Sequence, residues 1–135
     1  MRIIVVAIVL SSCLPKPQKE YTPDEVVSIN DLKELMRVQA HHADPQFGKR
    51  EQESFSDAEH ADMAETGKML QATSARIKGF AGKGELDDGF AKYAAELGQH
   101  AKALEDAGTA KDAAKVRGAL ESIRTTCKSC HGVYR

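Results

Sequence analysis

Two cysteines and a histidine stand close together near the end of the chain, in the order Cys127-Lys128-Ser129-Cys130-His131. This Cys-x-x-Cys-His spacing is typical of c-type haem attachment, in which both thiols form thioether bonds to one porphyrin. Residues three apart share one face of a helix, so Cys127 and Cys130 could reach two vinyl groups of the same macrocycle. His131 would then turn its imidazole toward the iron as an axial ligand. The motif therefore predicts a helix that borders a haem.

Two other cysteine chemistries fit the sequence less well. A redox dithiol is typical of a βαβ setting, and nothing in this sequence indicates alternating strands. A zinc site needs a fourth ligand from a second short-spaced pair, but the only other cysteine is Cys13. His41 and His42 are consecutive, which is poor spacing for completing such a site. Haem attachment is the favoured interpretation.

The N-terminal sequence is typical of an export signal. Met1-Arg2 supplies a positive charge, residues 3–10 are apolar, and Ser11-Ser12-Cys13 follows them. An apolar segment this short cannot span a bilayer. We expect residues 1–12 to be a lipoprotein signal peptide, Cys13 to be acylated, and the protein to be periplasmic and membrane-anchored. An ordinary cleaved signal with an incidental cysteine is the alternative.

Residues 13–22 contain prolines and lysines and are expected to form a lipidated polar tether that provides reach alone. Residues 23–135 are expected to form one domain. The chain has 19 basic and 20 acidic residues and a formal net charge of -1, which gives no argument for nucleic-acid binding.

Four segments of this domain carry apolar residues at the spacing of an amphipathic helix. Capping sequences precede three of them, at Thr22–Glu25 or Ser28–Asp31, at Ser56–Glu59 and at Thr109–Asp112, and a glycine-rich loop precedes the other. Asp44-Pro45 should bend or end the first helix, and residues 46–55 have no clear expected structure. Both cysteines of the motif fall on the apolar stripe of the last helix. The sequence predicts an all-α, antiparallel four-helix bundle with haem in the core near the C-terminal helix.

The end of the chain resembles the cytochrome c′ family, low-spin members included. The likeness is carried by Asp112, Cys127, Cys130, His131, Tyr134 and Arg135, with a fainter similarity over Asp31–Ala43. The resemblance implies a left-handed four-helix bundle with one covalent haem c between the helices. It also implies electron transfer or the binding of small gases such as nitric oxide and carbon monoxide.

Met36 is the candidate for the sixth iron ligand. A thioether is an ordinary haem ligand, and Met36 stands on the apolar stripe of the first helix, formed by Ile29, Leu32, Met36, Ala40 and Ala43. Simple core filling is the alternative role for Met36, and His41 and His42 are competing ligands. The other methionines and histidines have simpler expected roles, with Met63 and Met69 packing in the core and His60 and His100 at the surface.

Basic residues near the motif have less specific interpretations. Arg135 lies four residues after His131, so its guanidinium could contact the proximal side of the haem, unless the helix end frays. Arg124 and Lys128 are expected on the outward side, where they would meet an acidic partner or simply be solvated.

Two functions remain open from sequence. The first is a lipid-anchored electron carrier with six-coordinate iron, which serves redox partner proteins of a periplasmic electron-transfer chain. The second is a five-coordinate protein that binds or detoxifies nitric oxide or carbon monoxide. The sequence offers no clear acid and base pair for peroxide chemistry, so a non-enzymatic carrier is favoured, with weak peroxidase activity left open. The oligomeric state, a homodimer included, also stays open.

Overall fold

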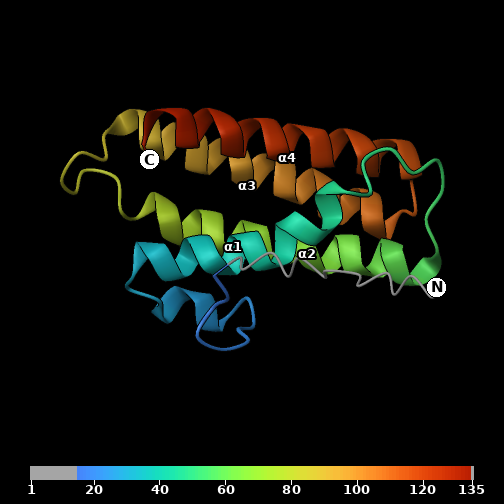
Figure 1. The fold of residues 1–135 in the computed structure, drawn as a ribbon, viewed down its shortest axis with the longest axis horizontal. Coiled ribbons are helices and arrows are strands. Elements are labelled where there is room, and N and C mark those ends of the chain that lie inside the picture. The colour runs from blue at the N-terminus through green and yellow to red at the C-terminus, as the bar shows by residue number, and fades with distance from the viewer. Residues whose placement is uncertain (1–14, 135) are drawn as a thin grey trace, which may run out of the picture.

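The structure, a computed structural model, describes residues 15–134, which form four α-helices and one short 3₁₀ helix. The elements are η1 (Glu25–Ser28), α1 (Leu32–Phe47), α2 (Asp57–Lys78), α3 (Asp88–Thr109) and α4 (Ala113–Val133). The four α-helices lie side by side along one long axis (Figure 1), and residues 15–134 contain no strand. The predicted all-α four-helix bundle is therefore confirmed. No helix within the described residues has the length and apolar character needed to cross a membrane.

Side-chain caps fix where the helices begin. The side chain of Ser56 accepts from the Glu59 backbone N–H, and the Glu59 side chain reaches back to Ser56, which makes the capping box that the sequence predicted. Asp31, Asp87 and Asp112 cap the other three α-helices, and each carboxylate accepts from a backbone N–H of the first turn, without a reciprocal bond. Of the two expected starts for the first helix, the later one begins α1 and the earlier one leads into η1.

The end of α1 lies close to its proline. Helix α1 runs two residues past Pro45 and ends at Phe47. Proline removes one backbone donor and crowds the preceding turn, but in the last turn of a helix few bonds remain to be lost. The chain then crosses to α4, where the Arg117 guanidinium donates to the carbonyls of Gln52 and Glu53 at 3.0 and 3.1 Å. These bonds order the segment for which the sequence made no prediction.

Helices α2 and α3 make the closest contact in the bundle. A Cβ placed on Gly67 would lie 2.6 Å from the Glu105 backbone nitrogen and 2.7 Å from the Ala101 carbonyl oxygen. A Cβ on Gly108 would lie 2.7 Å from the backbone of α2. Only glycine permits so short an approach between two helix backbones. Helix α1 packs on α2 but touches α4 at few points. The bundle is therefore least tightly packed between α1 and α4.

The core confirms one set of side-chain predictions and corrects another. Met63 and Met69 are buried, as their packing role required. His60 is buried too, with 5% of its surface exposed, so the prediction that it lies at the surface is wrong. The ring of Phe55, whose centroid lies 5.5 Å from that of His60, folds over it from the preceding loop. Sequence neighbours of His60 are polar, and a loop contact of this kind leaves no trace in helical periodicity.

Part of the predicted tether is packed on the bundle. Tyr21 lies against an apolar cluster that includes Val26 and Leu35. The backbone N–H of Gln18 donates to a carboxylate oxygen of Glu34 at 2.6 Å. Residues 15–21 therefore follow the surface of α1. Cys13 and the predicted signal peptide lie outside the described residues.

Candidate functional site

Two cavities open between α1 and α4, and they share the residues at their boundary. One has a volume of about 440 Å³ and the other about 780 Å³. Met36, Ala40 and His131 line both of them. Pockets for small molecules and cofactors commonly measure roughly 300–1,000 Å³. The two cavities thus flank a methionine and a histidine, with room for a flat ligand that extends to both sides.

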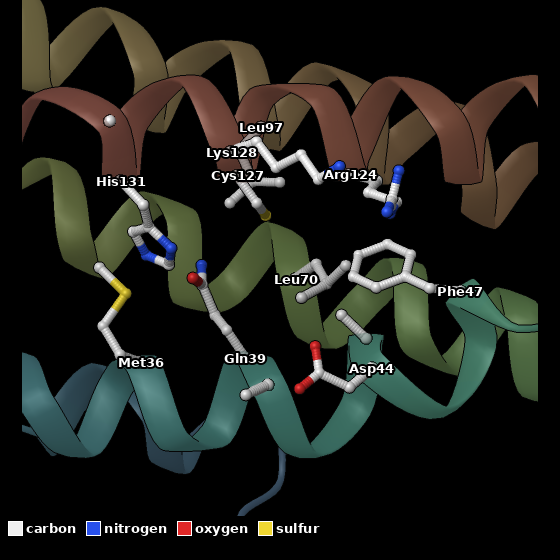
Figure 2. A pocket seen from close by; sticks show the side chains of 13 residues that line it. Met36, Gln39, Asp44, Phe47, Leu70, Leu97, Arg124, Cys127, Lys128 and His131 are labelled. Carbon is white, nitrogen blue, oxygen red and sulfur yellow. The ribbon is translucent and has the colours of Figure 1, made fainter. Parts of the chain in front are cut away.

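Met36 and His131 face one another across this space. Figure 2 shows the Met36 side chain rising from α1 and the His131 ring descending from α4, so that the thioether and the imidazole point toward each other. Leu32, Met36, Ala40 and Ala43 all line one cavity or the other. The apolar stripe that the sequence indicated on the first helix is therefore the face of α1 that borders the cavities.

The two cysteines of the motif reach the cavities from α4. Cys127 lines the smaller one and Cys130 the larger one, and both line a narrow pocket of about 30 Å³ that Met36 and His131 also border. Both thiols are free. Burial raises the pKa of Cys127 to about 11, so at neutral pH it is an uncharged thiol. Two neutral thiols on one helix face, beside an apolar space, suit thioether formation with a single ligand.

Gln39 and Asp44 border the same space, and the sequence analysis missed both. Gln39 is 8% exposed, and its side-chain Nε2 donates to Thr73 Oγ1 of α2 at 3.1 Å. The Thr73 hydroxyl donates in turn to the Leu70 carbonyl at 3.1 Å. This chain of bonds holds the Gln39 amide at the edge of the smaller cavity, one helical turn from Met36. Burial raises the pKa of the Asp44 carboxyl, and the charge of His131 acts in the opposite direction.

These two residues escaped the sequence analysis for a simple reason. Both residues are polar, so they do not belong to the apolar stripe that marked the site. The hydrogen-bond partner of Gln39 lies on another helix, 34 residues along the chain. The one available signal was spacing, because Gln39 follows Met36 by three residues and so shares its helix face.

The competing histidines lie elsewhere. His41 and His42 line a separate pocket of about 170 Å³ together with Asp62 and Glu65 of α2. His41 Nε2 lies 3.4 Å from a carboxylate oxygen of Glu20, and burial lowers the pKa of His42. Neither histidine lines the cavities that His131 borders. The geometry brings Met36, and not these histidines, to His131.

The basic residues of α4 agree only in part with the prediction. Arg124 and Lys128 line the smaller cavity, and Figure 2 shows them beside Cys127 at its upper edge. Lys128 is exposed, in agreement with the predicted outward position, whereas Arg124 is half-buried at the cavity, which differs from that prediction. Arg135 lies outside the described residues, so its predicted contact stays a prediction.

Tyr134 closes the end of α4 against α3. Its hydroxyl donates to the Asp87 carboxylate, and its ring packs edge-on against Phe90, with centroids 5.4 Å apart. The hydrogen bond to Asp87 raises the pKa of Tyr134 to about 12. Tyr134 lines the larger cavity next to Cys130. The last turn of α4, which carries the motif, is thereby fixed to the start of α3.

The comparisons with known proteins point to one family. The family model of cytochrome c′ matches residues 85–135. Over this segment the chain is similar to cytochrome c′. The match covers α3, α4 and the Cys-x-x-Cys-His motif, and it does not reach the fainter similarity over Asp31–Ala43. No curated protein and no solved structure matches the chain significantly.

The cytochrome c′ match implies a covalently bound haem c, and the described residues fit that group. The donor set is complete for it, with two thiols for the thioether bonds, an imidazole after the second thiol and a thioether opposite. The walls are largely apolar, and small Ala40 and Ala43 leave open space beside Met36. The cavities between α1 and α4 are therefore a consistent place for a haem held by Cys127 and Cys130.

Proposed function

We propose that this protein is an exported, lipid-anchored monohaem cytochrome that carries single electrons. In this proposal Cys127 and Cys130 hold the haem, His131 is the proximal iron ligand and Met36 the distal one. Cys13 carries the lipid, and the partners are redox proteins of a periplasmic electron-transfer chain. The observation that carries the proposal is the opposition of Met36 and His131 across the space between α1 and α4.

The residues of the chain would act by holding and shielding the group. A haem c bound here supplies a one-electron iron couple. Thioether and imidazole ligands are both neutral, and methionine ligation raises the potential of a haem. A sixth ligand from the protein also keeps small molecules off the iron. Leu70 and Leu97 form the apolar wall on the bundle side of the site. Such an arrangement favours electron transfer over ligand chemistry.

A gas-binding function is the second candidate, and one observation favours it. The smaller cavity offers about 440 Å³ next to Met36, with the Gln39 amide at its edge. Methionine has a flexible side chain, so a diatomic ligand could displace the Met36 sulfur from the iron with little loss of packing contacts. If Met36 is not a ligand, the iron has an open distal side toward this cavity.

Replacement of Met36 separates the two functions. We expect the wild-type ferric protein to be low-spin, with a weak far-red sulfur-to-iron charge-transfer band, and the ferrous protein to bind carbon monoxide slowly. Met36→Ala should open the site, give a high-spin spectrum and bind carbon monoxide at least tenfold faster.

Met69→Ala is the matched control. Met69 is also buried, with 4% of its surface exposed, in the apolar cluster against which Met36 packs, but it lines none of the cavities that His131 borders. Its removal should cost about 2–5 kcal/mol of unfolding free energy and leave the spectrum low-spin. A high-spin wild-type protein that takes up carbon monoxide readily would refute Met36 ligation and favour the gas-binding function. A low-spin spectrum that persists in Met36→Ala would point to another ligand.

A further inference from the structure

We propose that the docked segment Pro15–Tyr21 holds the mouth of the larger cavity against the membrane surface. The cavity mouth would thus face the bilayer. This orientation of the bundle follows from the point at which the N-terminal segment leaves it. The inference rests on the lipidation of Cys13 in the proposed function. It replaces the idea that residues 13–22 only provide reach.

The docking of this segment is built from buried and polar contacts. Glu34 is 2% exposed, and its carboxylate accepts from the Gln18 backbone N–H at 2.6 Å and from Arg37 at 3.3 Å. A buried carboxylate without these donors would carry a large desolvation cost, so the bond to Gln18 is not easily released. Tyr21 packs against the apolar cluster that includes Val26 and Leu35, and a carboxylate oxygen of Glu20 lies 3.4 Å from His41 Nε2.

The docked segment leads directly to the cavity. Pro15 lines the larger cavity together with Cys130, His131 and Tyr134. The first described residue of the chain therefore lies at the mouth of the candidate haem site. The wall on this side also includes Leu32 and Leu86, which are apolar, and Lys33, which is exposed.

Chain length then limits where the anchor can be. Cys13 precedes Pro15 by two residues. Two extended residues span at most about 7 Å, whereas ten free residues would span about 35 Å. With Pro15–Tyr21 docked, an acylated Cys13 must stay close to the cavity mouth. The bundle cannot turn this mouth away from the bilayer without breaking the contacts of Gln18 and Tyr21.

The surface at this end of the bundle suits a lipid interface. Among residues 15–134, the large hydrophobic side chains with the greatest exposure are Val27 at 73% and Val133 at 63%. Val133 lies in the last turn of α4, next to cavity residue Tyr134, and Val27 lies in η1. Figure 1 shows η1 and the end of α4 at the same end of the bundle. The cavity wall carries both signs of charge, with exposed Asp31 next to Lys33, so the match to a membrane surface rests on the exposed apolar side chains.

The experiment measures which face is covered when the acylated, haem-loaded protein sits on vesicles. The probes are Lys33→Cys at the cavity wall and, as a matched control, Ala103→Cys, which is exposed on α3. Helix α3 packs mainly on α2 and α4, away from α1. A bulky, water-soluble maleimide reports accessibility, since the other cysteines are acylated or thioether-bonded. The vesicles are phosphatidylcholine with one fifth phosphatidylglycerol, and the reference is the same protein in detergent.

We expect labelling of Lys33→Cys to slow at least fivefold on vesicles and labelling of Ala103→Cys to change less than twofold. Insertion of twelve Gly/Ser residues between Cys13 and Leu14 should keep the protein on the vesicles but abolish the difference. Equal labelling of both probes in a protein that floats with vesicles would overturn the orientation. A protein that does not float would instead refute lipidation, which is a failure of the proposed function.

Discussion

Gly67→Ala tests the close approach of α2 and α3. The new methyl group would lie 2.6 Å from the Glu105 backbone nitrogen and 2.7 Å from the Ala101 carbonyl oxygen. Neither is a side-chain atom that can rotate away, so the two helices must separate. We expect the separation to loosen the bundle, with α4 moving along with α3, on which it packs.

The magnitude follows from two opposed effects. Alanine is favoured over glycine within a helix by about 1 kcal/mol. Overpacking a close interface costs about 1–3 kcal/mol, and contacts with immobile backbone atoms lie at the upper end of that range. The net loss of unfolding free energy should be about 2 kcal/mol. For a domain of this size, that corresponds to a fall in Tm of roughly 8 °C.

Gly118→Ala is the matched control, because a Cβ at Gly118 has no neighbouring atom within 4 Å and the residue is exposed on α4. This variant should gain about 1 kcal/mol, a rise in Tm of roughly 4 °C. The assay is urea unfolding of the haem-loaded proteins, followed by circular dichroism at 222 nm, with m-values compared across the series. A Gly67→Ala protein as stable as Gly118→Ala would refute the close packing of α2 on α3.

Two further predictions concern the end of α4. The hydrogen bond to Asp87 raises the pKa of Tyr134 to about 12, above the ordinary 10.0, so its stabilising effect is complete below pH 10 and is lost as pH rises toward 12. Ultraviolet titration should show a tyrosine that ionises near pH 12, and Tyr134→Phe should remove that step; an unchanged titration would contradict the contact. Cys127→Ala and Cys130→Ala should each keep haem through one thioether bond, whereas the double variant should lose it to acid-acetone extraction. Haem that washes out of the wild-type protein would contradict covalent attachment.

Local patterns in the sequence determined much of this protein. Periodicity predicted four helices, and the capping box at Ser56 predicted the start of α2. The same periodicity indicated which face of the first helix carries Met36, and that face borders the cavities. These features depend on residues within one or two turns of each other, and such relations are visible in any single sequence.

Only the tertiary structure decided how those helices meet. No local pattern predicts that α1 stands apart from α4. The burial of His60 under Phe55 and the bond from Gln39 to Thr73 also depend on contacts that no helical periodicity reveals. The docking of Gln18 on Glu34 is of the same kind, since it depends on a backbone donor and a carboxylate 16 residues apart. A helical stripe shows which residues share a face. The rotation of each helix and its distance from its neighbours are set by contacts such as Gly67 against Glu105, where one missing Cβ fixes the spacing.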